Sequence, residues 1–444
     1  MTLDVGCISL FVFIMKSMNS KILILSLIAP AIFQTAVAKD INLKSFGAKA
    51  DGKTKVTVIL QKAIDEVSKS GGGRVVLMDG IYLTGPVQLK DGVDLHIDGT
   101  AKLIASPDIA DYPEWPDPKH IISENLPRGN RNACLIFADE AERIAITGRG
   151  VIDGNGTFHV RKKDTTDKHR WQYERIYPNE QSLPRMVFFA GCKDVLIEDV
   201  TMTNQPAGWS YWLHDCDRVT IRGLQILADV TYPNNDGIDL NCCRDVTVSD
   251  CHIECGDDAI IVRANSRSLH ENKPMERVTV TNCLLRSGSA AIRVGWTNDG
   301  VIRHCSFSNI VMTDTYTGIS IRIPPCETIN TDWGREETLI EDMAFSNITM
   351  DGIFRFPIQA WVTSDPGTKV EAIRDIRFSN IHSKGSHFPY FWGRENNLLR
   401  NFSFDQCSFI CEKDSDEPEL ELFKFVEGFV FNNVTFTEST VPVN

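Results

Sequence analysis

One short pattern of apolar residues recurs along the second half of this chain and constrains its fold more than any other feature. Each copy reads apolar-x-apolar-x-x-apolar-x-apolar, as in Val219, Ile221, Leu224 and Ile226. The copies begin at Val195, Val219, Val246, Val278, Cys305, Met343, Ile376, Phe402 and Phe429. Since alternate residues of a strand face the same side, each copy predicts two short strands joined by a two-residue corner.

The corners of these copies repeat at one phase and often carry Asn. They include Ser308-Asn309, Ser346-Asn347, Ser379-Asn380 and Asn432-Asn433. Successive copies begin 24 to 38 residues apart, which is typical of the coils of a β-solenoid. An antiparallel sandwich also has many short strands, but it would not repeat one corner at one phase nine times. The pattern predicts an all-β parallel β-helix, and the absence of a linker predicts a single domain over residues 39–444.

A single helical stretch precedes the strands. Apolar residues recur near helical spacing from Val56 to Lys69, and Gly71-Gly72-Gly73 ends the stretch. A solenoid must cover the apolar end of its first coil. We therefore expect this helix to be an N-terminal cap.

Residues 1–38 have the features of an export signal. Lys16 and Lys21 precede the apolar run 22–33, and Ala36-Val37-Ala38 follows as a small-x-small cleavage site. We therefore predict an exported protein, periplasmic or secreted.

The apolar run of this signal contains Pro30 and is short for a membrane span. We expect no membrane span in the mature chain, which would begin near Lys39. Because residues 1–14 are apolar and lie before the charged region, we expect translation to start at Met15 or Met18, with an unusual signal anchor as the alternative.

The net charge of −13 excludes nucleic-acid binding as a property of the whole chain. Twelve of the 13 cysteines follow the predicted cleavage site. Four of them occupy apolar positions of the repeat and should behave as small buried hydrophobic residues: Cys251, Cys283, Cys305 and Cys407. The sequence does not decide whether a disulfide forms among Cys242, Cys243, Cys251 and Cys255. No cysteine or histidine spacing matches a zinc site, so we expect no metal. We also expect that the protein has no cofactor and is a monomer.

Two acidic motifs lie in register with the repeat. Asp236 in Asn234–Leu240 and Asp257 in Cys255–Ile260 are 21 residues apart. On adjacent coils, about 4.8 Å apart, these residues and Asp258 would crowd one surface. Like charges so close raise at least one carboxyl pKa, as a general acid requires. Each motif alone also fits a turn, but the two together favour chemistry.

Five longer stretches interrupt the repeat and are interpreted as insertions: residues 157–184, 264–276, 324–340, 354–374 and 384–400. Insertions of a solenoid gather on one face, often the binding face. These carry Trp171, Trp333, Trp361 and Trp392, which would either stack on sugar rings or anchor the loops.

Several landmarks carry a family resemblance. They are Phe46-Gly47-Ala48 with Asp51-Gly52, Gly71-Gly72-Gly73, Tyr82-Leu83-Thr84-Gly85-Pro86, Gly150–Gly156, Pro184-Arg185, Asn234-Asn235-Asp236-Gly237 and Gly256-Asp257-Asp258. In this combination, nearly the whole mature chain resembles the polygalacturonase-like enzymes of glycoside hydrolase family 28. The resemblance implies a right-handed parallel β-helix and hydrolysis of a pectic polysaccharide or oligosaccharide, of galacturonan or rhamnogalacturonan type.

The resemblance also implies roles for the acidic residues. Asp257 would be the general acid, while Asp236 and Asp258 would activate water for an inverting reaction. Inversion requires two carboxyl groups about 6.5–9.5 Å apart. Because adjacent strand residues face opposite sides, Asp257 and Asp258 can share a cleft only if the backbone bends, which Gly256 permits. Asn234 and Asp239, in the same motif, are expected to contact substrate.

The chain departs from the family at two motifs. Where the family has Gly-His-Gly, Ser289 or Ala290 stands in place of the histidine, and we expect Ser289 to contact substrate. Where the family has Arg-Ile-Lys, the chain reads Ser320-Ile321-Arg322. These departures leave the sugar at the cleaved position open.

Three arginines at equivalent phases, Arg263, Arg293 and Arg322, are predicted to bind a carboxylate of an acidic sugar. His214 lies one coil before Asp236. It would either contact substrate hydroxyls or be a hydrogen-bonded residue of the pocket wall, and we favour contact with substrate.

Three functions compete. The first is a glycoside hydrolase, which the loops suggest is exo-acting. The second is a polysaccharide lyase on the same fold, which would commonly need Ca²⁺ or a basic residue. The third is a non-catalytic carbohydrate-binding protein, which has no need of three clustered carboxylates.

Overall fold

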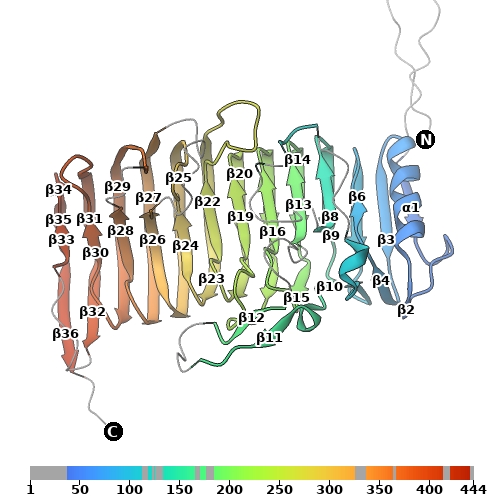
Figure 1. Cartoon of the computed structure of the whole chain (residues 1–444), viewed down its shortest axis with the longest axis horizontal. Coiled ribbons are helices and arrows are strands. Elements are labelled where there is room, and N and C mark those ends of the chain that lie inside the picture. Colours follow the sequence, from blue (N-terminus) through green and yellow to red (C-terminus); the bar gives the residue numbers. More distant parts are fainter. Residues whose placement is uncertain are drawn as a thin grey trace, which may run out of the picture. The chain divides into compact units, whose positions relative to one another are not determined.

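The computed structural model describes residues 38–112, 119–122, 125, 134–165, 171–176, 185–325, 337–363, 367–413 and 421–440. They belong to one compact unit, Val37–Asn444, in which strands form coils that stack in sequence order (Figure 1). The signal segment 1–38, with its starts at Met15 and Met18, lies outside the described residues except for Ala38. Pro184 and Trp333 also lie outside them.

Two sheets run the length of the stack. The smaller has 11 strands: β5 (Val87–Gln88), β8 (Cys134–Asp139), β13 (Arg185–Ala190), β16 (Tyr211–His214), β19 (Ile238–Asn241), β22 (Ile260–Arg263), β24 (Ala290–Val294), β26 (Thr317–Ile323), β28 (Ile358–Val362), β30 (Tyr390–Trp392) and β33 (Phe423–Lys424).

The larger sheet has 23 strands. They are β1 (Lys39–Asn42), β2 (Asp51–Lys55), β3 (Gly73–Leu77), β4 (Gly80–Thr84), β6 (Val93–Ile97), β7 (Ala101–Ala105), β9 (Glu142–Thr147), β10 (Val151–Asp153), β14 (Lys193–Glu198), β15 (Thr201–Thr203), β17 (Asp217–Arg222), β18 (Gln225–Leu227), β20 (Arg244–Ser249), β21 (His252–Cys255), β23 (Met275–Ser287), β25 (Val301–Thr315), β27 (Thr338–Ile353), β29 (Val370–Gly385), β31 (Leu399–Asp405), β32 (Ser408–Lys413), β34 (Val426–Glu427), β35 (Val430–Asn432) and β36 (Thr435–Thr440).

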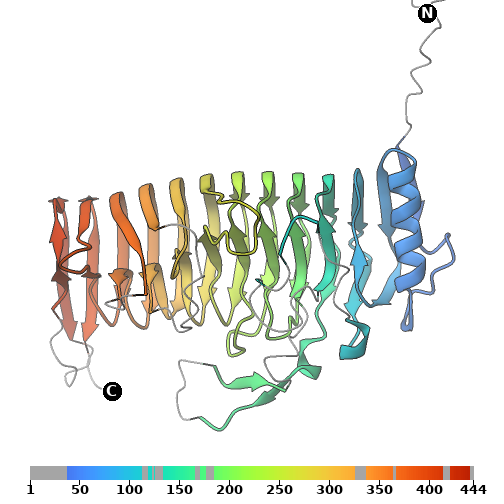
Figure 2. The ribbon, with the colours of Figure 1, turned by 45° about the horizontal axis from the view of Figure 1, so that its top comes forward.

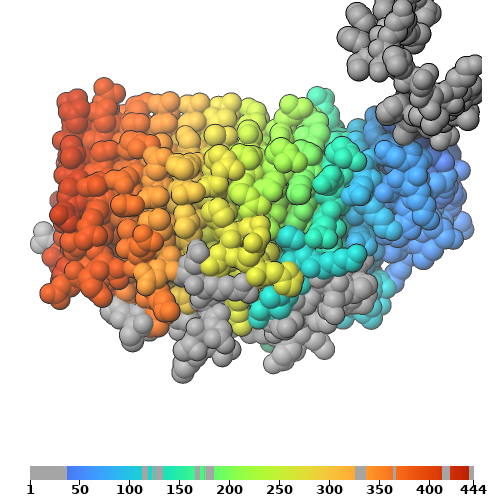
Figure 3. Space-filling model, turned by 90° about the horizontal axis from the view of Figure 1, so that it is seen from above, coloured from blue at the N-terminus to red at the C-terminus, as the bar shows by residue number. Residues whose placement is uncertain are grey.

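Neighbouring coils pair in parallel along both sheets, as in β14 with β17 and β19 with β22. An antiparallel hairpin, β11 (Val160–Lys162) with β12 (Tyr173–Arg175), projects from the stack (Figure 2). In the space-filling view the colours succeed one another in bands, so each coil lies against its sequence neighbours (Figure 3). The predicted all-β parallel β-helix is confirmed.

The inward positions of the repeat form ladders of like residues. Phe345 lies between Phe307 and Phe378, with ring centroids 4.9 and 5.1 Å away and the rings nearly parallel. Phe404 continues the ladder 4.9 Å beyond Phe378. These distances match the spacing of neighbouring strands, about 4.8 Å, because one side chain comes from each coil. The repeat in the sequence is therefore the packing unit of the core.

The corners stack in the same way. Asn309, Asn347 and Asn380 all have positive φ, which Asn tolerates better than most residues. Asn347 Nδ2 donates to Asn309 Oδ1 at 3.1 Å, and Asn380 Nδ2 donates to Asn347 Oδ1 at 2.9 Å. The corner residue thus allows the turn and also links successive coils.

The predicted helix is α1, Thr57–Lys69. It lies at the N-terminal end of the stack (Figure 1), and its buried residues Leu60, Ala63, Ile64 and Val67 join the main core. This packing supports the predicted role as a cap. No helix in the described ranges has the length and apolar character that a membrane crossing needs.

The interpretation of residues 354–374 and 384–400 as insertions is wrong. They contain β28 and β30, which belong to the smaller sheet. Each coil therefore has a third strand besides the two that the repeat predicted. In coils such as those of β13 and β19 this strand is buried on both faces, so its sequence does not alternate, and β30 is only three residues long.

The 11 described cysteines are buried. They include Cys251, Cys283, Cys305 and Cys407, as predicted. The disulfide left open among Cys242, Cys243, Cys251 and Cys255 does not form.

Candidate active site

The two acidic motifs form equivalent corners of adjacent coils. Asp236 precedes β19, while Asp257 and Asp258 lie between β21 and β22. The backbone N–H of Gly237 donates to the carbonyl of Asp258 at 2.9 Å, which stacks one corner on the other. The expected juxtaposition of the three carboxylates is therefore present.

The backbone bends at Gly256, as expected. A Cβ at this position would lie 2.0 Å from the carbonyl oxygen of Tyr232, so the close approach requires glycine. The N–H of Gly256 donates to Oδ1 of Asn235 at 2.6 Å, which holds the bend against the preceding coil. Because of this bend, Asp257 and Asp258 both face the pocket although they are consecutive.

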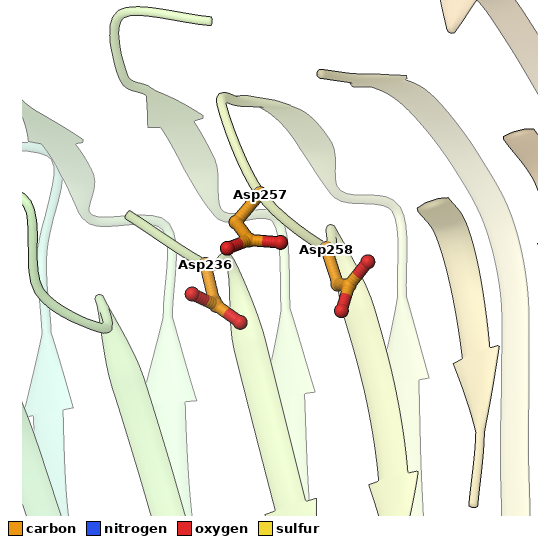
Figure 4. Close-up of side chains that lie close together, drawn as sticks. All are labelled: Asp236, Asp257 and Asp258. Atoms are coloured by element: carbon orange, nitrogen blue, oxygen red, sulfur yellow. The ribbon is translucent and has the colours of Figure 1, made fainter. Parts of the chain in front are cut away.

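Figure 4 shows the side chains of Asp236, Asp257 and Asp258 converging from these corners. One oxygen from each lies within 4.8 Å of the others, and all three residues are buried. This nearest-oxygen distance is shorter than the carboxyl separation of about 6.5–9.5 Å in an inverting pair. The geometry therefore does not itself indicate inversion. Clustered carboxylate oxygens of this kind are the ligands preferred by hard metal ions such as Ca²⁺ and Mg²⁺.

Neighbouring polar groups hold the carboxylates of Asp257 and Asp258 in place. Asn234 Nδ2 donates to Oδ2 of Asp257 at 2.9 Å. The N–H of Ala290 donates to Oδ1 of Asp258 at 3.0 Å, and Arg293 Nε lies 2.8 Å from its Oδ2 without hydrogen-bond alignment. Arg293 and Asn234 therefore position the acidic cluster, in addition to lining the pocket.

A pocket of about 460 Å³ surrounds this cluster. Its lining residues are Asn125, Trp171, Trp209, Trp212, Asn234, Asp236, Asp239, Leu240, Asn241, Asp257, Asp258, Ile261, Arg263, Asn265, Arg267, Ser268, Gly288, Ser289, Arg293, Trp296 and Arg322. Trp171 and residues 265–268 come from the predicted insertions 157–184 and 264–276. These two loops therefore shape the pocket. Ser289 also lines it, and its contact with substrate stays a prediction.

Arg322 is the cation best placed for an anionic ligand. Its Nε is buried without a hydrogen-bond partner, and its guanidinium lies 4.8 Å from the ring of Trp296 and 5.8 Å from that of Trp361. Burial and the neighbouring Arg293 lower the pKa of Arg322 to about 10. The guanidinium therefore stays charged near neutral pH. A bound anion would replace the contacts with water that the guanidinium lost on burial.

Arg263 has a different role from the one predicted. It forms a two-point ion pair with the fully buried Asp299, with Nε–Oδ2 and Nη2–Oδ1 distances of 2.6 and 2.7 Å. Its donors are therefore largely used by the protein, although part of the side chain lines the pocket. We interpret Arg263 as a structural residue of the wall.

His214 is likewise a wall residue, against our preference for substrate contact. It is fully buried, its Nε2 is 2.7 Å from Ser268 Oγ, and its Nδ1 is 2.5 Å from Asn241 Nδ2. Burial lowers the pKa of His214 to about 4, so the ring is neutral. Because Ser268 and Asn241 line the pocket and His214 does not, its effect on substrate is indirect.

Three tryptophans of the pocket were not assigned from sequence. Trp212 stacks on Phe188 at 4.2 Å and meets Trp209 edge-on at 5.0 Å, while Trp296 follows β24. The guanidinium of Arg185 lies 4.7 Å from the ring of Trp212. The two tryptophans in Trp209-Ser210-Tyr211-Trp212, one coil before the acidic motifs, were the available signal. Trp171 donates from Nε1 to the carbonyl of Gly256 at 2.6 Å, which anchors its loop; it also lines the pocket, and stacking on a sugar ring stays a prediction.

Fold and site together define a parallel β-helix protein with a carboxylate-lined pocket. Residues 71–389 match the sequence pattern of the glycosyl hydrolases family 28, and the chain belongs to this family.

A probable polygalacturonase of Vitis vinifera is 29% identical over 295 residues, covering 64% of this chain and 57% of the relative. An exo-poly-alpha-D-galacturonosidase of Dickeya chrysanthemi is 26% identical over 324 residues, covering 66% and 53%. The chain thus spans little more than half the length of these curated relatives. The solved family 28 exopolygalacturonase of Yersinia enterocolitica is 21% identical with a TM-score of 0.69, covering 92% of this chain and 79% of that chain. That likeness shows the fold.

Proposed function

We propose that this protein is a glycoside hydrolase that cleaves pectic polysaccharide or oligosaccharide, of galacturonan or rhamnogalacturonan type. The observation that carries the proposal is the convergence of Asp236, Asp257 and Asp258, with oxygens within 4.8 Å, in a pocket of a family 28 chain. Hydrolysis of a glycosidic bond requires a carboxylic acid for the leaving oxygen and a carboxylate that acts on water or the sugar.

In this proposal Asp257 protonates the leaving glycosidic oxygen. Asp236 and Asp258 hold and activate the attacking water. The contacts of Asp258 with Ala290 N–H and Arg293 hold its carboxyl group in place beside Asp236 and Asp257. Inversion of the anomeric centre is carried over from the family and is tested below.

The substrate is proposed to contain an acidic sugar. Arg322, desolvated and without an ion pair among the described residues, supplies the cation for its carboxylate. Trp171, Trp209 and Trp296 offer faces or edges to sugar rings.

We further propose action from a chain end. The loop at 265–268 forms part of the pocket wall and is held by Ser268, whose carbonyl accepts from the N–H of Ile122 at 2.8 Å. The names of the relatives from Dickeya chrysanthemi and Yersinia enterocolitica are consistent with exo action. Export and a monomeric state also remain proposals.

The test is product analysis on galacturonan, rhamnogalacturonan and their oligosaccharides. Asp257→Asn is the inactive variant, and Asp351→Asn, an exposed carboxylate on β27, is the matched control. Release of one monosaccharide by the wild type and the control, but not by Asp257→Asn, would support the proposal. Near-wild-type turnover by Asp257→Asn would refute the assignment of the acid.

The same assay separates the alternatives. Loss of activity in chelator together with a product that absorbs in the ultraviolet would indicate a lyase. Saturable binding of the sugars without any product would indicate a carbohydrate-binding protein.

A further inference from the structure

A fourth carboxyl group, Asp239, lies in the pocket and has no hydrogen-bond or ion-pair partner among the residues that the structure describes. It is on β19, is 7% exposed and lines the pocket beside the acidic cluster. Its Oδ2 is buried without a hydrogen bond, and among the described residues no ion pair involves this side chain. A buried carboxylate in this state would lack the compensation that buried charges require.

The residues paired with Asp239 on the two neighbouring strands are large and mainly apolar. In the parallel register Asp239 pairs with Trp212 on β16 and with Ile261 on β22. Equivalent positions of parallel strands face the same side, so these two side chains flank the carboxyl group. Both are buried, at 3% and 2% exposure. The surroundings of Asp239 are therefore apolar on both sides.

The nearby charges do not offset this burial. Burial is the main cause of a pKa of Asp239 well above the ordinary range, and the negative charges of Asp258 and Asp257 add to it. Arg263 and Arg185 act in the opposite direction. Arg263 is already paired with Asp299.

Two further groups complete this environment. Arg185 lies over the rings of Trp209 and Trp212. His214, at the end of β16, is neutral because its pKa is about 4. No positive charge is therefore dedicated to Asp239.

Resting on the proposed function, we propose that Asp239 binds the sugar as a neutral carboxylic acid and donates a hydrogen bond from its O–H to an oxygen of an acidic sugar residue. A neutral carboxyl group is a donor, whereas an ionised one only accepts. An ionised Asp239 would add a fourth negative charge to a pocket that must admit an anion, and like charges repel strongly in a dry site. Asp239 and Arg322 are then complementary: the neutral acid avoids repulsion and the arginine attracts.

The inference predicts how binding depends on pH. Above its pKa, Asp239 loses the proton that it donates and becomes repulsive to an anion. Affinity for an acidic sugar should therefore fall at alkaline pH, by up to about tenfold per pH unit for one proton. The affinity for a neutral sugar of similar shape should fall much less, because only the hydrogen bond is lost.

Calorimetric titration with galacturonate and with galactose tests this between pH 5 and pH 9. Neither monosaccharide contains a glycosidic bond between sugar residues, so the intact acidic cluster can be used. The proteins are the wild type, Asp239→Asn, Asp239→Ala and the exposed control Asp351→Asn. Asn keeps a donor at the same place and cannot ionise. The upper limit of pH 9 keeps Arg322 charged, since its pKa is about 10.

We expect the affinity of the wild type and of Asp351→Asn for galacturonate to fall at alkaline pH. Asp239→Asn should remove that fall, while Asp239→Ala should bind galacturonate about tenfold more weakly than Asp239→Asn at all pH values. An equal loss in Asn and Ala, the same alkaline fall in Asp239→Asn, or no galacturonate binding at any pH would overturn the inference. If galacturonate binds as expected but no pectic substrate is cleaved, the hydrolase proposal fails and the role of Asp239 stands.

Discussion

Replacing Asp239 by Asn should make the protein more stable, by an amount that grows with pH. In the folded protein burial raises the pKa of Asp239 well above its ordinary range. In the unfolded chain the group ionises near its ordinary pKa of about 3.9. The stabilisation associated with a raised pKa is fully present below the unfolded pKa and is lost as the pH rises toward the folded pKa. Asn does not titrate, so its contribution is constant.

The magnitude follows from linkage. For each pH unit between the two pKa values of Asp239, the wild type loses about 1.4 kcal/mol of unfolding free energy relative to Asp239→Asn. The other titrating groups are common to both proteins and largely cancel in the difference. The buried Oδ2 of Asp239 has no hydrogen bond that the substitution would break. Over any pH interval between these two pKa values the variant should therefore gain on the wild type at this rate.

Urea unfolding at pH 4, 5, 6 and 7, followed by tryptophan fluorescence, measures this difference. Asp351→Asn is again the control, because an exposed carboxyl group should give a difference that changes little with pH. Equal slopes of unfolding free energy against denaturant would show that the same transition is compared. A difference that stays flat, or that shrinks as the pH rises, would refute the conclusion that Asp239 is neutral in the folded protein.

Three further predictions concern the substrate, the stereochemistry and the core. Arg322→Ala should raise KM for an acidic oligosaccharide at least tenfold and change KM for a neutral one much less, since Arg322 has no ion pair among the described residues; equal changes would remove the case for carboxylate recognition. Proton NMR of the first product should show the anomer opposite to the substrate linkage; retention would instead indicate a covalent intermediate, consistent with the short carboxylate spacing. Phe345→Ala should lower the unfolding free energy by about 3–5 kcal/mol, because Phe345 is fully buried between two rings, whereas Phe158→Ala, at an exposed position, should change it by less than about 1 kcal/mol.

Much of the site could be predicted because its residues repeat with the coil. Asp236 and Asp257 are separated by about one coil, so sequence spacing alone indicates that they stack. The bend at Gly256 was predictable because two consecutive carboxylates cannot otherwise share a side. The hydrogen-bond and ion-pair partners of His214 and Arg263 could not be predicted in this way. Their partners, Ser268 and Asp299, lie 54 and 36 residues away in loops that follow no repeat.

The sequence by itself determined the parallel β-helix, its corner ladders and the acidic cluster, because alternation and period are local properties that each coil repeats. The tertiary structure decided what surrounds that cluster. In coils such as those of β13 and β19 the third strand has no alternation to reveal it, since both of its faces are buried. The partnerless state of Asp239 depends on Trp212 and Ile261, which only the register of neighbouring coils brings to its sides. A periodic pattern indicates which face a residue occupies, but its charge state is set by neighbours that come from other coils and loops.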